Sequence, residues 1–147
     1  MCSSDLSNMY HFLNEPKSKK WLDEWATITG DFDQIVAYTD LGDLFLINSK
    51  TNEIGILLTM ANKFHTMGFT DWDEFRGEVM ENPKFQEDVI QKSFIQNVRS
   101  HCGKLEEYQV YIPTPYPCLG GSGEPETHKV GDLWVYLAIS SQTFTKL

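Results

Sequence analysis

Residues 35–58 read IVAYTDLGDLFLINSKTNEIGILL, a stretch with three short segments rich in β-forming residues. The segments are Ile35–Tyr38, Leu44–Ile47 and Ile54–Leu58, and polar turn residues separate them. Such short connections cannot hold a crossover, so consecutive strands are expected to pair antiparallel. We therefore expect a β-meander, with Gly42 in a turn that requires a positive φ.

Helical patterns lie on both sides of this stretch. Apolar residues recur at helical spacing in Lys17–Ile28, Trp72–Met80 and Phe85–Cys102. Thr70 or Asp71 suits the N-terminal cap of the second helix. Asn82-Pro83 restarts the chain before the third helix, which Gly103 is expected to end.

The last forty residues constrain the backbone strongly. Glu107–Ile112 predicts a strand, after which a loop rich in proline and glycine leads to a possible strand at Thr127–Val130. In Leu133–Phe144 the apolar residues have helical spacing, although Trp134-Val135-Tyr136 also suits a strand. We favour the helix.

The pattern as a whole indicates one α+β domain, in which an antiparallel sheet of short strands packs against several helices. Residues 1–16 are interpreted as a polar N-terminal lead and residues 17–147 as the domain. The start of the chain has no signal-peptide pattern. No apolar run approaches the roughly 20 residues that span a bilayer. A cytoplasmic location is therefore expected.

Charge restricts the class of partner. The chain has 21 acidic and 12 basic residues, a net charge of −9. This balance argues against nucleic acid as a ligand, because affinity for phosphates comes mostly from Lys and Arg. It permits a basic protein partner, since opposite charges accelerate encounter. The acidic residues concentrate in residues 31–53 and residues 71–81.

No motif for catalysis or for metal binding is present in the sequence. The three cysteines, Cys2, Cys102 and Cys118, form no CxxC pair. Adjacent helical residues such as His101 and Cys102 point about 100° apart and cannot pair. Acid pairs such as Asp31/Asp33 lie in polar loops, where burial that would raise a pKa is not expected. We predict no cofactor, no metal, no catalytic residue and no enzymatic activity.

Three pieces of the chain together resemble one protein family. They are Thr39-x-x-Gly42-Asp43-Leu44-Phe45, the end of the long helix at Gly103-Lys104-Leu105, and the tail Tyr111-x-Pro113…Leu119-Gly120-Gly121…Leu133-x-Val135-Tyr136-Leu137-x-Ile139…Gln142. In this order and spacing they resemble the C-terminal immunity domain of type VI secretion DNase-immunity proteins, which is often joined to a GAD-like domain. The chain has too little sequence before this region for a full GAD-like domain.

The resemblance implies an antitoxin that binds and neutralises a cognate secreted effector, a nuclease. It also implies an architectural role for Gly42 and for Leu119, Gly120 and Gly121. We expect a monomer or weak oligomer that contacts neither nucleic acid nor membrane. Our hypothesis for the contact surface is Asp31, Asp33, Asp40, Asp43 and Glu53, with Trp72 and the 71–81 cluster as the next choice. Charge reversal of three of these acids is expected to slow association without altering stability.

Two alternatives remain open at this point. One is a small-molecule sensor or regulatory binding domain with the proline-glycine loop as the rim of its pocket. The other is a metal-independent hydrolase, which requires a pocket that holds a buried carboxylate or histidine with a shifted pKa.

Overall fold

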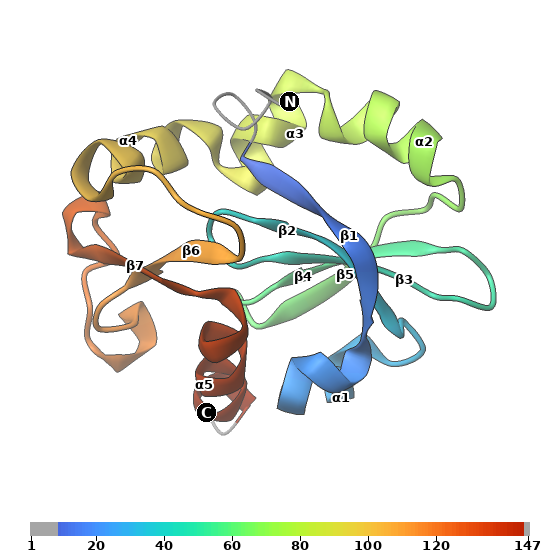
Figure 1. Cartoon of the computed structure of the whole chain (residues 1–147), viewed down its shortest axis with the longest axis horizontal. Helices are drawn as coiled ribbons and strands as arrows, with labels where there is room; N and C mark the ends of the chain where they lie inside the picture. Colours follow the sequence, from blue (N-terminus) through green and yellow to red (C-terminus); the bar gives the residue numbers. More distant parts are fainter. Residues whose placement is uncertain (1–8, 146–147) are drawn as a thin grey trace.

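A five-stranded antiparallel sheet forms the centre of the protein (Figure 1), and its strands follow one another in sequence order. The computed structural model describes residues 9–145, and the side chains up to residue 143. The predicted meander is confirmed as β2, β3 and β4, and one further strand pairs with each side of it. The strands are β1 (Tyr10–Ser18), β2 (Gln34–Thr39), β3 (Leu44–Ile47), β4 (Ile54–Leu58) and β5 (Lys63–Thr66).

The first strand corrects the interpretation of the N-terminal region. Residues 10–18 belong to the sheet instead of a polar lead, while residues 1–8 lie outside the described residues. The register of β1 against β2 shifts between Phe12 and Lys17, which interrupts the alternation that would have identified a strand. Pro16 is tolerated within β1 because an edge strand can lack a hydrogen-bond donor. The predicted helix at Lys17–Ile28 accordingly begins later, as η2 (Lys19–Trp25) followed by α1 (Ala26–Thr29).

Helical segments cover both faces of this sheet, which places it in the middle of three layers (Figure 1). One face packs against a long helical run, with Phe45, Phe75 and Ile95 in a shared core. The other face packs against η2, α1 and the C-terminal helix α5 (Leu133–Thr145). There Trp25 donates a hydrogen bond of 3.2 Å from Nε1 to Ser140 Oγ. Burial on both faces explains why β3 reads as an uninterrupted apolar run.

The long helical run consists of short pieces. Asp71 caps its first turn by accepting from Asp73 N and Glu74 N, and Pro83 occupies a first-turn position, as predicted. The predicted continuous helix over Phe85–Cys102 is wrong, because Gln91 adopts a left-handed conformation with φ 69° and divides it. The pieces are α2 (Trp72–Phe75), η3 (Arg76–Met80), α3 (Pro83–Phe85), η4 (Gln86–Ile90) and α4 (Lys92–Cys102).

A two-stranded antiparallel sheet, β6 (Gln109–Pro113) and β7 (His128–Asp132), lies beside the meander. The proline-glycine loop joins its strands and contains the turns η5 (Pro117–Leu119) and η6 (Pro125–Thr127). A Cβ at Gly121 would stand 1.9 Å from the carbonyl oxygen of Pro115, so only glycine fits this loop. The favoured helix for the last segment is confirmed as α5. The chain is thus a single α+β domain.

Candidate functional site

The turn between β2 and β3, residues 39–43, brings together the three pieces of sequence that carry the family resemblance. Thr39 Oγ1 accepts from the backbone nitrogens of Leu41 and Asp43, at 3.3 and 3.2 Å. Gly42 has φ 88°, which confirms the predicted positive-φ turn. A Cβ at Gly42 would lie 2.5 Å from Cε2 of Tyr136 in α5, so the turn and the C-terminal helix meet at this glycine.

Asp40 joins this turn to β1, α4 and β6. Its side chain is 1% exposed, with Oδ1 2.6 Å from His11 Nε2 and Oδ2 accepting from Arg99 Nη2 at 2.9 Å. Its backbone oxygen accepts from Tyr111 N at 2.8 Å, and Tyr111 donates through its hydroxyl to Gly103 O. A buried carboxylate is stable only when paired and hydrogen-bonded, and these contacts meet that condition.

Asp43 is buried in a different environment, with 7% exposure, and its side chain accepts from an uncharged residue, Thr59. Its Oδ1 accepts from Thr59 N at 2.9 Å and from Thr59 Oγ1 at 3.3 Å. The hydroxyls of Thr59 and Tyr136 share a hydrogen bond of 2.8 Å. Burial disfavours the charged form and raises the pKa of Asp43 to about 7, because the Thr59 bonds offset only part of the desolvation.

These contacts correct the predicted contact surface. Asp40 and Asp43 are interior groups that hold the fold together, so neither carboxylate is presented to a partner. They also lie at the opposite end of β2 from Asp31 and Asp33, roughly 20 Å away at 3.3 Å per residue. Charge reversal at Asp40 or Asp43 is therefore expected to destabilise the protein, contrary to the expectation from sequence.

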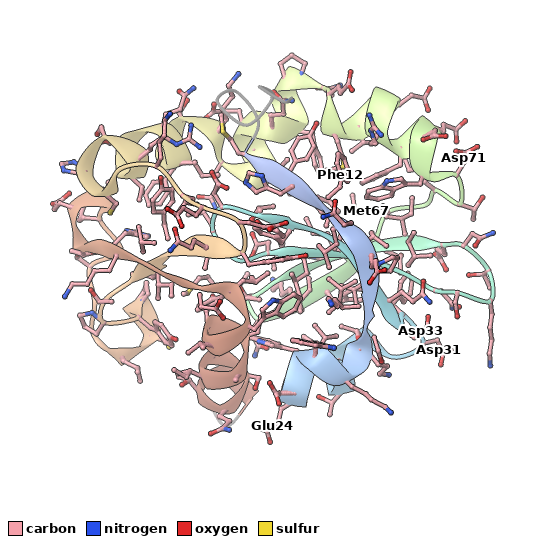
Figure 2. The ribbon with its side chains drawn as sticks, viewed as in Figure 1. Phe12, Glu24, Asp31, Asp33, Met67 and Asp71 are labelled. Atoms are coloured by element: carbon pink, nitrogen blue, oxygen red, sulfur yellow. The ribbon has the colours of Figure 1, made fainter. Side chains whose placement is uncertain are left out.

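Three of the predicted acids do gather at one end of the sheet. Asp31 is exposed, and Asp33 and Glu53 are partly exposed beside it, at the ends of β2 and of the β3–β4 hairpin. Figure 2 shows Asp31 and Asp33 next to each other at this end. Asp33 accepts from Ser49 N at 2.8 Å and from Ser49 Oγ at 2.6 Å, and these bonds lower its pKa. This group remains available to a partner.

Trp72 is half-buried and lies between the core and the surface. Its ring stacks on Phe75 with centroids 5.6 Å apart and meets the edge of Phe12 at 5.7 Å. Phe12 is 40% exposed and carries Arg76 over its ring at 4.9 Å. Sequence reasoning missed Phe12 because β1 was not recognised as a strand. The aromatic surface at this point therefore consists of Phe12 and Trp72 together.

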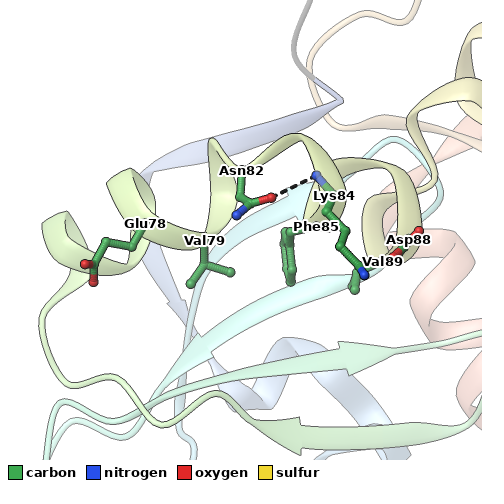
Figure 3. Close-up of a pocket in the computed structure, with 7 residues that line it drawn as sticks. All are labelled: Glu78, Val79, Asn82, Lys84, Phe85, Asp88 and Val89. Carbon is green, nitrogen blue, oxygen red and sulfur yellow. Dashed lines mark hydrogen bonds between the residues drawn. The ribbon is translucent and has the colours of Figure 1, made fainter.

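A groove of about 330 Å³ lies elsewhere in the same helical layer, between η3 and η4 (Figure 3). Its apolar lining is Val79, Phe85 and Val89, and its charged lining is Glu78, Lys84 and Asp88. None of the buried ionisable groups described above contributes to it. The proline-glycine loop does not line this groove either.

The described residues, 9–145, contain neither a cluster of metal-ligating side chains nor a helix suited to crossing a membrane. No group of three or more His, Cys, Asp or Glu side chains in this range is placed to hold a metal ion. Within the same range, no helix is both long enough and apolar enough to cross a membrane.

Comparison with known proteins shows the fold alone. No family model matches the chain, and no curated protein matches it. Among solved structures, the crystal structure of Atu4351 from Agrobacterium tumefaciens is similar, with a TM-score of 0.61. The two sequences are 16% identical, and the match covers 92% of this chain and 67% of that one. This chain therefore shares its α+β architecture with the Agrobacterium protein.

Proposed function

We propose that this protein is a cytosolic immunity protein that binds a cognate secreted toxin, a nuclease, and neutralises it. The observation that carries the proposal is the charge of one helical layer, the one formed by α2, η3, α3 and η4. Residues 71–90 contain seven acidic residues and two basic ones, and all seven acids are exposed. A nuclease needs a basic surface to hold nucleic acid, and an acidic protein of matching shape competes for that surface.

The interior polar groups support binding over catalysis. A catalytic carboxylate must reach the reacting atoms of its substrate. Asp40 is instead held by His11 and Arg99, and Asp43 by Thr59, in contacts that tie separate elements together. Asp43 does have the raised pKa that the hydrolase alternative requires, but it does not line the groove. Burial within the fold therefore accounts for the raised pKa of Asp43 without a catalytic role.

Co-production with a toxin tests the proposal. The candidate partner is the protein encoded in the neighbouring reading frame. We expect the two proteins to co-purify as a complex, and we expect this protein to block the nuclease activity of its partner in stoichiometric amounts. Full nuclease activity in the presence of excess protein would rule out immunity against that toxin.

The alternative of a small-molecule binding domain is favoured by one observation. The groove volume of about 330 Å³ falls at the lower end of the roughly 300–1,000 Å³ of ligand pockets. A ligand that occupies the groove would raise the melting temperature, and the stabilisation would grow with the logarithm of its concentration above Kd. A thermal-shift screen of metabolites separates this alternative from immunity, which predicts stabilisation by the toxin.

A further inference from the structure

The groove in the helical layer combines an apolar floor with charged ends. Figure 3 shows Glu78 at one end and Asp88 at the other, with Val79, Phe85 and Val89 between them. Phe85 also contacts Phe75 edge-on at 6.4 Å, so the floor of the groove is continuous with the core. Asn82 caps α3 by accepting from Lys84 N at 2.8 Å, which fixes the turn between the two helical pieces. The groove is therefore built from well-anchored elements.

The surroundings of the groove are strongly negative. Three further glutamates are exposed in the same stretch of chain, Glu74 on α2, Glu81 directly after η3 and Glu87 on η4. Lys84 is the basic residue of the lining, and Arg76 on η3 is positioned over Phe12. Residues 71–90 thus carry a net charge of −5, from seven acidic and two basic residues, out of −9 for the whole chain. A cationic segment approaching this face is attracted over the length of the layer.

We propose that this groove receives an apolar side chain from a basic segment of the toxin. Burial of that side chain against Val79, Phe85 and Val89 provides affinity, because apolar area is removed from water. Lysine or arginine residues beside it meet Glu78 and Asp88, which speeds encounter and fixes the orientation. This inference rests on the proposed immunity function, and it places the main contact on the helical layer instead of the group formed by Asp31, Asp33 and Glu53.

Three variants test the groove. Glu78→Lys with Asp88→Lys reverses the charge at both ends, and Val89→Thr replaces an apolar methyl by a hydroxyl of similar size. Glu124→Lys with Glu126→Lys is the control, because it makes the same change in net charge at exposed positions around η6. Thermal melts confirm that each variant folds. Biolayer interferometry then measures association and dissociation with the neighbour-encoded protein, prepared as a catalytically inactive variant.

The groove pair is expected to lower affinity at least about tenfold, mainly through slower association. Val89→Thr is expected to lower affinity about threefold to tenfold, mainly through faster dissociation. The control pair should change affinity less than about threefold, because exposed charges far from a contact are screened.

Four results would overturn the inference. If wild-type protein binds the toxin and the groove variants bind equally well, the groove is not the contact, while the immunity function stands. Equal losses for the groove pair and the control pair would indicate a general effect of net charge. If the groove pair leaves toxin binding intact but dissociates a dimer of this chain, the occupant is a second copy. Failure of the wild-type protein to bind the toxin contradicts both the function and the groove.

Discussion

At the scale of single residues, Asp40 and Asp43 show how one turn can hold two buried carboxylates by different means. Asp40 lies between His11 and Arg99, so opposite charge compensates its desolvation. Asp43 accepts from the backbone amide and the hydroxyl of Thr59. These neutral donors offset only part of its desolvation, and burial raises its pKa to about 7. The two acids are therefore expected to respond differently to substitution.

The raised pKa of Asp43 predicts a specific pH dependence. The folded protein holds this proton up to pH 7, whereas the unfolded chain loses it near the ordinary value of 3.8. The contribution of Asp43 to stability is therefore complete below about pH 4 and is lost as the pH rises through 7. Between pH 5 and 8 this loss amounts to roughly 2–3 kcal/mol. Asp43→Asn should remove it while retaining an oxygen that accepts from Thr59.

Urea unfolding of wild type and Asp43→Asn at pH 5 and pH 8 measures this effect. The difference between the two proteins isolates Asp43, because His128 contributes to both equally. Burial lowers the pKa of His128, so its own contribution to stability rises with pH over the same range. The account of Asp43 is wrong if the two proteins lose the same free energy of unfolding between pH 5 and pH 8.

Removal of the charge of Asp40 is expected to destabilise the protein. Asp40→Asn leaves Arg99 without its carboxylate partner, and we expect a loss of about 2–3 kcal/mol at pH 7. Asp31→Asn is the matched control, since Asp31 is exposed and should change stability by less than about 0.5 kcal/mol. Similar midpoints of urea unfolding for the two variants would show that the ion pair does not stabilise the fold.

At the scale of elements, the proline-glycine loop depends on one close approach. Gly121→Ala would place a methyl group 1.9 Å from the oxygen of Pro115, and we expect a destabilisation of roughly 2 kcal/mol or more. Gly77→Ala is the control, because a Cβ at this helical glycine meets nothing within 4 Å. That variant should gain up to about 1 kcal/mol from helix propensity. Thermal unfolding of both variants checks the contrast, and equal stability would contradict the geometry of the loop.

The elements also show what the sequence can predict. The meander, the caps at Asp71 and Pro83 and the end of α4 at Gly103 were predicted because their signals are local turn and cap chemistry. β1 was missed because its register shift hides the alternation. The break at Gln91 was missed because a non-glycine residue in the left-handed region has no local sequence signal.

The candidate site was only partly predictable for a related reason. The partners of Asp40 lie 29 and 59 residues away along the chain, so its burial depends on contacts that only the fold creates. The exposed acids of the helical layer were visible in the composition, whereas the groove between them requires η3 and η4 to be placed in space.

At the scale of the whole molecule, the buried acids and the exposed acids have separate roles. The interior acids connect β1, the meander, α4 and α5, and thereby hold the three layers together. The exterior acids lie on the helical layer and at the Asp31 end of the sheet, where they remain available for contact. The first set determines stability, and the second is proposed to determine recognition.

The most direct measurement of the proposed function is a calorimetric titration of this protein with the protein encoded in the neighbouring reading frame, prepared as a catalytically inactive variant. We expect a one-to-one complex whose affinity falls roughly tenfold or more between 50 and 500 mM salt, because exposed charges steer and hold the partner. No detectable complex at about 10 μM of each protein, a concentration far above the Kd of specific complexes, would contradict the account.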